Sequence, residues 1–363
     1  MIKELLQELS CLPGVSGYED CIGKYMRRQF SKYCNNVTTD TAGNLIAEFR
    51  SRNPKGKRVM VFAHMDQLGF VVKRIDRAGF LRIERLGGIP EKILPGLEVQ
   101  VRNRKGDWIG GVIGNKSHHV TDASEKYRVI PLQELYVDLG LSSSIEVEEL
   151  GILPGCPVVY KPRFVQLTND RCYGTALDNR GGCAILLDLA EKLSANPCDF
   201  NVYIVGTVQE EYNLRGAMIA CASVEPDFVI ALDVAITGDT PDMQEILPVS
   251  LGAGPVMSMY NFHGRGTLNG TIPHPYLVEM TERAAADLGL RLQRTASCGI
   301  LTDASYAQLY GKGVPAIDLG FPCRYTHTAV ELCSITDLEQ LSSLVEEILR
   351  QTQGDIDFTR KYE

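Results

Sequence analysis

The sequence predicts an α/β protein of two domains. A small all-β domain at residues 69–163 interrupts a larger α/β domain formed by residues 1–68 and 164–363. Helix-like and strand-like segments alternate on both sides of the interruption, whereas short strand-like runs separated by glycine and proline fill it. A chain of 363 residues is long enough for about two domains and for a sizeable core.

The segment before the interruption contains two expected helices and two expected strands. Residues 2–10 and 19–31 carry apolar side chains at helical spacing, and residues 44–49 and 58–63 are short apolar runs typical of strands. From Gly69 onward, alternating runs such as FVVKRI, LEVQVR and DWIGGVIG are separated by turns, and the turn sequence LPG occurs twice. This texture predicts a small β domain.

After residue 175, strands and helices alternate again. We expect helices at 180–194, 214–223, 275–288 and 336–351, and strands at 201–208, 227–233 and 314–319. Alternation of this kind favours a largely parallel sheet with helices on both faces. The two outer segments are therefore expected to form one domain.

Composition and charge exclude several classes of protein. Asp and Glu number 45 against 37 Lys and Arg, a net charge of −8 without the clustered basic charge of a nucleic-acid-binding protein. The eleven cysteines include no CxxC pair and indicate reduced thiols rather than a disulfide framework. The N-terminal segment lacks the apolar region of a signal peptide, and no 18 apolar residues run together. We expect a cytoplasmic protein that binds neither nucleic acid nor membrane.

Possible ligand residues follow the predicted strands at one edge of the sheet, where open α/β sheets bind their ligands. They are His64 and Asp66, Asp178 before the helix at 180–194, Glu210 and Glu211, Asp233, and His327 in the loop after the last strand. Each has a simpler explanation on its own, such as a solvated pair of glutamates or a helix N-cap. Their convergence on one edge favours a metal site.

The donor types indicate which metals and how many. Histidines and carboxylates without cysteine suit Zn²⁺, Co²⁺ or Mn²⁺. Six such groups exceed the needs of one tetrahedral ion and suit two ions about 3.5–4 Å apart, which Asp178 is suited to bridge. One of Glu210 and Glu211 would bind metal while the other accepts a proton from water. Asp66 is placed to accept the second ring N–H of His64.

Five motifs carry a family resemblance. They are HxDxxGF (64–70), ALDNRxG (176–182), QEExxxRGA (209–217), ALDV (231–234) and GxPxRxxH (320–327). In this order they resemble the glutamyl and tetrahedral (TET) aminopeptidases of peptidase family M42, some of which are labelled endoglucanases. The likeness extends from about residue 5 to residue 350, nearly the whole chain.

The resemblance implies a role for each candidate residue. His64 and Asp233 would bind one metal ion, Glu211 and His327 the other, Asp178 would bridge them, Glu210 would be the general base and acid, and Asp66 would orient His64. It also implies a three-layer α/β/α phosphorylase/hydrolase-like catalytic domain with an inserted barrel-like or PDZ-like dimerisation domain. Family members form dimers that build tetrahedral shells of twelve subunits, so we expect self-association.

The sequence departs from the family pattern near the expected pocket. Gln67 replaces an acidic residue, and Asn213 and Leu301 replace glycines, which we expect to bear on substrate preference. His118 and His119 fall in the β insert, where a surface or interface role is expected.

These observations predict a two-metal aminopeptidase acting on peptides. Glu210 would take the proton of the attacking water and return it to the leaving amine. Two other hydrolases remain open: a two-metal deacylase of acylated small molecules, and a metal-free glycoside hydrolase that uses Glu210 and a second carboxylate. The two histidines count against the glycoside hydrolase. A non-catalytic assembly protein would have lost a ligand or the base, and none is lost.

Overall fold

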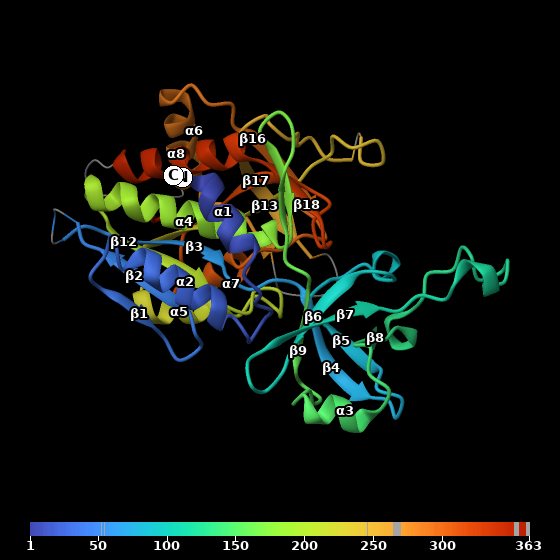
Figure 1. The fold of residues 1–363 in the computed structure, drawn as a ribbon. Helices are drawn as coiled ribbons and strands as arrows, with labels where there is room; N and C mark the ends of the chain where they lie inside the picture. Colours follow the sequence, from blue (N-terminus) through green and yellow to red (C-terminus); the bar gives the residue numbers. More distant parts are fainter. Residues whose placement is uncertain (52, 54, 245, 264–269, 352–355, 361–363) are drawn as a thin grey trace.

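The computed structural model describes the chain except for residues 52, 54, 245, 264–269, 352–355 and 361–363. It has two parts, a large α/β part and a smaller β barrel that projects from it (Figure 1). The barrel strands all lie between Gly69 and Tyr160, and the chain returns to the large part at Phe164.

A twelve-stranded sheet forms the middle of the large part. Its strands are β1 (Val37–Thr39), β2 (Leu45–Phe49), β3 (Arg58–His64), β10 (Phe164–Gln166), β11 (Arg171–Gly174), β12 (Asn201–Thr207), β13 (Phe228–Ile236), β14 (Val256–Phe262), β15 (Gly270–Thr271), β16 (Gln293–Cys298), β17 (Ala316–Arg324) and β18 (Glu331–Ser334). The main order is β1-β2-β12-β3-β13-β17-β18-β11-β10, and β14 pairs with β15, β16 and β17. The four central strands β12, β3, β13 and β17 are parallel, so their carboxyl ends meet at one edge.

Helices cover both faces of this sheet. One face carries α1 (Ile2–Ser10), α2 (Asp20–Phe30), α4 (Leu177–Ala195), α6 (Pro275–Asp287) and α8 (Ile335–Arg350), and the other carries α5 (Gly216–Val224) and α7 (Ala304–Ala307). Strand β3 shows why both faces need cover, because Val59 and Val61 enter one core while Met60 and Phe62 enter the other. The predicted three-layer α/β/α architecture is confirmed.

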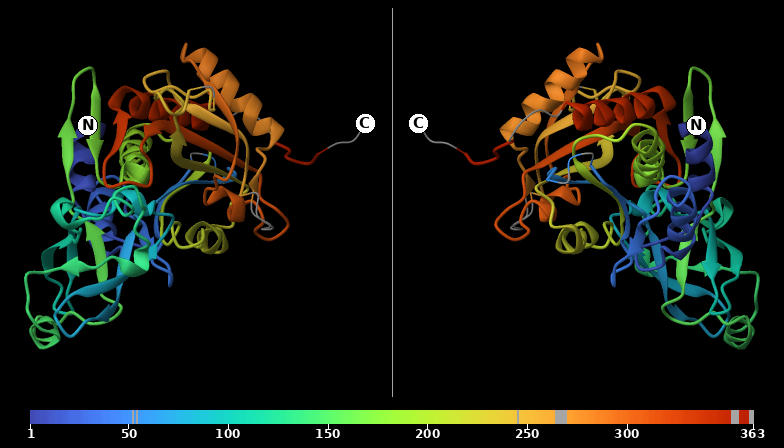
Figure 2. Two further views of the ribbon diagram at one scale, coloured as in Figure 1. Left: turned by 90° about the vertical axis from the view of Figure 1, so that its right-hand side faces the viewer. Right: turned by 90° about the vertical axis from the view of Figure 1, so that its left-hand side faces the viewer.

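The smaller part is a closed barrel with a core of its own. Its strands are β4 (Gly69–Ile75), β5 (Leu81–Leu86), β6 (Glu98–Arg102), β7 (Trp108–Ile113), β8 (Val137–Asp138) and β9 (Pro157–Tyr160). They close in the order β4-β5-β8-β7-β6-β9, with the short helix α3 (Ser144–Glu149) between β8 and β9. Phe70, Val101 and Val158 are among the side chains that fill the barrel. The segment between β7 and β8 extends away from the barrel as an arm (Figure 1). The two side views show the barrel at one side of the large part (Figure 2).

The sheet differs from the expected one at its edges. The run of parallel strands is limited to the four central ones, because β2, β14 and β18 join them antiparallel. At the edge, β14 and β16 also pair parallel. The strands expected at 227–233 and 314–319 run on to Ile236 and Arg324, since β13 and β17 remain paired as far as Ile236 and Cys323. Gly320 and Pro322 obscured that extension, because both residues usually interrupt strands. No helix in the described part of the chain has the length and hydropathy that crossing a membrane requires.

Candidate active site

The candidate residues begin at the ends of two neighbouring strands. His64 is the last residue of β3 and pairs in register with Thr207, the last residue of β12. Glu210 and Glu211 follow Thr207 by three and four residues, after Gln209 at a positive φ of 56°. The parallel register therefore brings the two glutamates to the same edge of the sheet as His64.

Asp178 lies at the start of α4, where the backbone is not yet helical. Its neighbour Asn179 provides the helix cap, since Asn179 Oδ1 accepts the N–H of Gly182 at 2.9 Å. Asn179 Nδ2 also donates to the carbonyl of Leu232 on β13 at 2.7 Å. Asn179 is therefore the residue that caps the helix. The carboxylate of Asp178 makes no cap and faces the site.

Asp178 occupies the centre of the cluster. Its Oδ1 lies 3.1 Å from His64 Nε2, and its Oδ2 lies 3.7 Å from His327 Nε2. His64 Nε2 is also 3.9 Å from Glu210 Oε2 and 3.8 Å from Asp233 Oδ1. The side chains of His64, Glu210 and Asp233 form one compact group of possible ligand atoms, and those of His64, Asp178 and Glu211 form a second.

One cavity of about 420 Å³ collects these side chains. Six of the residues expected from the sequence are among those that line it: His64, Asp178, Glu210, Glu211, Asp233 and His327. Asp66, by contrast, lies behind the wall and is fully buried. All seven residues expected from the sequence therefore meet in one place, six at the cavity and one behind it.

Both histidines present Nε2 toward the carboxylates. His64 Nδ1 lies 3.1 Å from the main-chain oxygen of Asp66, and His327 Nδ1 lies 2.6 Å from that of Gly88. A carbonyl oxygen only accepts, so each Nδ1 carries a proton, and in the neutral ring each Nε2 keeps its lone pair. This is the tautomer that a metal-binding histidine needs. Gly88 comes from the barrel segment after β5, so the barrel helps to orient His327.

The carboxylate of Asp66 does not accept the ring N–H of His64, which we expected it to accept, but binds main-chain N–H groups. It lies 3.6 Å from His64 Nδ1, too far for a hydrogen bond, and the ring donates to the main chain instead. Asp66 Oδ1 accepts the N–H of Glu210 at 3.0 Å, and Oδ2 accepts the N–H of Glu211 at 3.1 Å. Asp66 therefore positions the two glutamates through its carboxylate and orients the His64 ring through its main-chain oxygen.

The electrostatics of the cluster show an excess of negative charge. Burial raises the pKa of Glu210 and of Glu211 well above the usual value, and neighbouring carboxylates add to the effect. Burial also raises the pKa of Asp233. Burial alone would lower the pKa of His64, but Glu210 and the hydrogen bonds to carboxylates outweigh it and raise that pKa well above normal. Such a cluster is suited to binding cations.

Two further buried carboxylates support the site and were missed in the sequence. Glu331 Oε2 accepts the N–H of Asp178 and Oε1 accepts the N–H of His327, both at 2.9 Å. Asp303 accepts the hydroxyl of Thr207 at 2.7 Å, and burial raises its pKa to about 7. Glu331 is the first residue of a short strand, a position that carries no sequence signal, whereas Asp303 belongs to the TDA sequence at 302–304.

The departures from the family pattern lie in different places. Gln67 faces away from the cavity, because its Oε1 accepts from Gly14 N–H and from the buried guanidinium of Arg180. Asn213 and Leu301 line the cavity. The exposed His118 and His119, by contrast, form a short turn in the barrel arm and are not among the described residues that line it.

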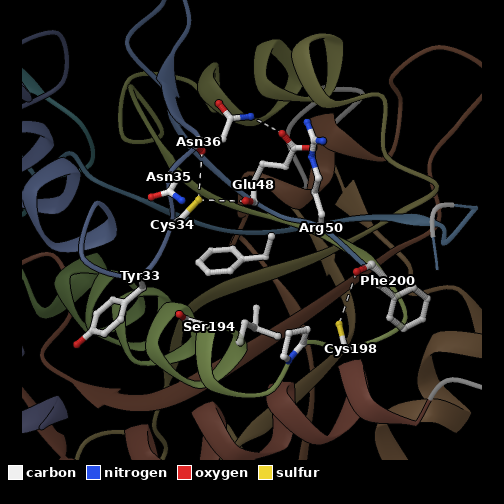
Figure 3. A pocket seen from close by; sticks show the side chains of 12 residues that line it. Tyr33, Cys34, Asn35, Asn36, Glu48, Arg50, Ser194, Cys198 and Phe200 are labelled. Carbon is white, nitrogen blue, oxygen red and sulfur yellow. Dashed lines mark hydrogen bonds and ion pairs between the residues drawn. The ribbon is translucent and has the colours of Figure 1, made fainter. Parts of the chain in front are cut away.

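A second cavity of about 420 Å³ lies elsewhere, between the segments after α2 and at the end of α4 (Figure 3). Its thiols point at main-chain oxygens: Cys34 Sγ donates to Glu48 at 3.0 Å, and Cys198 Sγ lies 3.7 Å from the oxygen of Phe200. Burial raises the pKa of both thiols, which keeps them protonated. This cavity has no convergent set of catalytic groups among the described residues.

Known proteins share both the sequence and the fold. The family model described as M42 glutamyl aminopeptidase matches residues 43–344. The Escherichia coli protein SgcX is 36% identical over 338 residues, covering 93% of this chain and 90% of SgcX. The lysyl aminopeptidase of Pyrococcus furiosus is 32% identical over 358 residues, covering 98% and 99%.

Solved structures agree with these relatives. The aminopeptidase APDkam598 from Desulfurococcus kamchatkensis has a TM-score of 0.90 and 32% identity, covering 97% of this chain and 95% of that one. The TET1 peptidase of Pyrococcus horikoshii has a TM-score of 0.84 and 29% identity, covering 97% and 100%. Fold and relatives together define a peptide hydrolase of the aminopeptidase class. The chain belongs to the M42 glutamyl aminopeptidase family, as its motifs predicted.

Proposed function

We propose that this aminopeptidase uses two divalent metal ions, Zn²⁺, Co²⁺ or Mn²⁺, bound at the carboxylate cluster. His64 and Asp233 would hold one ion and Glu211 and His327 the other. The observation that carries the proposal is the central position of Asp178, which presents one oxygen to each histidine at 3.1 and 3.7 Å. The chemistry of the donors fits, since each Nε2 offers a lone pair in the neutral ring and no lysine or arginine is among the described residues that line the cavity.

The protein groups supply proton transfer and positioning. When bound, the metal ions would supply Lewis-acid activation of the water and of the scissile carbonyl. Glu210 accepts the proton of the attacking water and donates it to the leaving amine, a task that suits a carboxylate lining the cavity beside the proposed metal ligands. Asp66 keeps Glu210 and Glu211 in place through their N–H groups. The negative charge of the carboxylates that line the cavity attracts the positive α-amine of the substrate.

The metal requirement and the exopeptidase activity are tested together. Protein stripped with EDTA should cleave no aminoacyl p-nitroanilide, and addition of Zn²⁺, Co²⁺ or Mn²⁺ should restore cleavage of free-amine substrates but not of their N-acetyl counterparts. Cleavage of the N-acetyl compounds alone would favour a deacylase. Full activity in EDTA with no bound metal would contradict the proposal.

We further propose that the barrel, residues 69–163, is a dimerisation domain and that copies of this cytoplasmic chain assemble through it. The P. horikoshii TET1 peptidase is described as assembling into a tetrahedron or a large octahedral shell. The arm that extends from the barrel carries exposed Val120 and Tyr127, and its turn includes His118 and His119. Sedimentation velocity should show particles larger than one subunit, and replacing Val120 and Tyr127 with serine should reduce their size. A monomer in both proteins would contradict this proposal.

A further inference from the structure

A narrow side pocket opens off the active-site cavity. Both are lined by Val234, Ile236, Ile300 and Thr302, so the two spaces adjoin. Strands β13, β14, β16 and β17 supply the other walls. The side pocket has a volume of about 30 Å³, against about 420 Å³ for the cavity it joins. So small a volume suits the end of an unbranched chain rather than a ring.

Asp318 is the charged residue of this pocket. The side chain is buried, and its Oδ2 accepts two hydrogen bonds, from Thr302 Oγ1 at 2.9 Å and from Asn261 Nδ2 at 3.0 Å. Oδ1 makes no hydrogen bond to any described residue, although Asp318 lines the pocket. The carboxylate is therefore oriented by two donors and keeps one oxygen for a ligand.

The sheet register places this carboxylate close to the proposed metal site. Asp233 on β13 is directly opposite Gly320 on β17, and Asp318 is two residues back along the same face. Gly320, the residue between them on this face, has no side chain, and a Cβ there would lie 3.1 Å from the main-chain oxygen of Asp233 and from Ala235 Cβ. Two residues of a strand span about 6.6 Å. An extended lysine side chain reaches roughly as far, about 6 Å from Cα to Nζ.

Asp318 has no lysine or arginine partner among the described residues. Among the described residues that line the pocket or the cavity there is no lysine or arginine, whereas Ser258, Thr295 and Ser297 add hydroxyl groups. Burial, and then Asp233, raise the pKa of Asp318 to about 7. A buried carboxylate without a cation is costly, and a cationic ligand would offset that cost.

We propose that the side pocket receives the side chain of the substrate's N-terminal residue and that Asp318 selects a basic residue there, lysine above all. This inference rests on the proposed aminopeptidase function. The ammonium group binds Asp318 Oδ1 while the methylene stem passes between Val234 and Ile300. A glutamyl residue is repelled by the same carboxylate, and the pocket is too small for an aromatic ring.

The test compares substrates of matched shape on the metal-loaded full chain. Lysyl and norleucyl p-nitroanilides share a linear stem and differ in the ammonium group. We expect wild-type kcat/KM to favour lysyl over norleucyl on the order of 100-fold, and this ratio to fall to near one in Asp318→Asn. Asp337→Asn is the matched control, because Asp337 also accepts two hydrogen bonds, from Gly252 and Gly254, but lies outside both cavities. Its ratio should equal the wild-type one.

The outcomes separate this inference from the function on which it rests. Equal or faster cleavage of norleucyl or glutamyl substrates by the wild type, or an unchanged ratio in Asp318→Asn, overturns the lysine preference alone. Cleavage of no aminoacyl substrate with any metal overturns the aminopeptidase proposal as well. If Asp318→Asn does not fold, inhibition of the wild type decides: lysine amide should inhibit at concentrations far below those of norleucine amide, and equal inhibition overturns the preference.

Discussion

Asp66 accepts the N–H of Glu210 through Oδ1 at 3.0 Å, which ties the residue after β3 to the loop after β12. The other oxygen accepts the N–H of Glu211 at 3.1 Å and the hydroxyl of Ser16 at 2.6 Å. A fully buried carboxylate with three donors has little freedom to rotate. Both glutamates are thereby held in place relative to His64 before a substrate binds, which is the preorganisation that proton transfer requires.

Glu210→Gln should lower kcat about a thousandfold, because the amide cannot accept the proton of the attacking water. Metal binding should persist, since Glu210 is proposed as a base rather than a ligand. Kinetics with the best anilide substrate and metal content per subunit measure the two effects separately.

Glu148→Gln is the matched control for that substitution, because Glu148 is an exposed glutamate on α3 of the barrel. It should keep wild-type kcat and metal content. Parental turnover by Glu210→Gln with metal bound would refute the assignment of the base, and loss of the metal would make Glu210 a ligand.

Asp233→Ala and His327→Ala should each reduce metal content from two ions to one per subunit. The two side chains belong to different proposed sites, and Asp178 remains in both variants to bind the ion that is left. Metal content after gel filtration, checked by calorimetric titration of the stripped protein, measures the stoichiometry. Loss of all metal in both variants would instead indicate a single shared ion.

Much of the fold and the site could be predicted from local sequence. The helices at 2–10 and 275–288 and the strand at 58–63 lie within one residue of their expected bounds, because periodic apolar side chains report which face is buried. The site residues could be grouped because parallel strands share an edge, a rule that needs only the order of strands. Asp178 was predicted to bridge the two ions because one aspartate can offer an oxygen to each.

Other features depend on contacts between distant segments. The carboxylate of Glu331 reaches the N–H of Asp178 only because β18 pairs with β17. His327 is oriented by Gly88, which lies 239 residues away in the barrel segment. The hydrogen bond expected between Asp66 and His64 was wrong because a nearer acceptor, the Asp66 carbonyl, was available. Sequence patterns do not report these partners.

Glu331→Gln should weaken metal binding by about 10- to 100-fold, the usual cost of losing an outer group that orients a ligand. The N–H groups of Asp178 and His327 donate to different oxygens of Glu331, and in the amide one of these positions becomes an NH2 donor that cannot accept. Competition with a chelator of known affinity measures the change.

Asp337→Asn is the appropriate comparison for Glu331→Gln, because it disrupts the same kind of double acceptor away from the metal cluster. It should lower the free energy of unfolding without changing metal affinity. Equal metal affinities in the wild type and Glu331→Gln would show that Glu331 serves stability alone.

Asp318→Asn should change how the stability of the metal-free protein depends on pH. Burial raises the pKa of Asp318 to about 7, against 3.8 for an ordinary aspartate. Between these two values the native state binds more protons than the unfolded state, so the free energy of unfolding falls as pH rises, by at most about 1.4 kcal/mol per pH unit. Asparagine does not titrate, so the free energy of unfolding of the variant does not fall for this reason.

Urea unfolding of both proteins from pH 4.5 to 8 measures the difference. The free energy of unfolding of the variant, relative to that of the wild type, should increase with pH until about pH 7 and stay constant above it. Parallel curves across the whole range would show that Asp318 titrates as an ordinary aspartate and is well solvated, and would also remove the electrostatic reason for it to attract a lysine side chain.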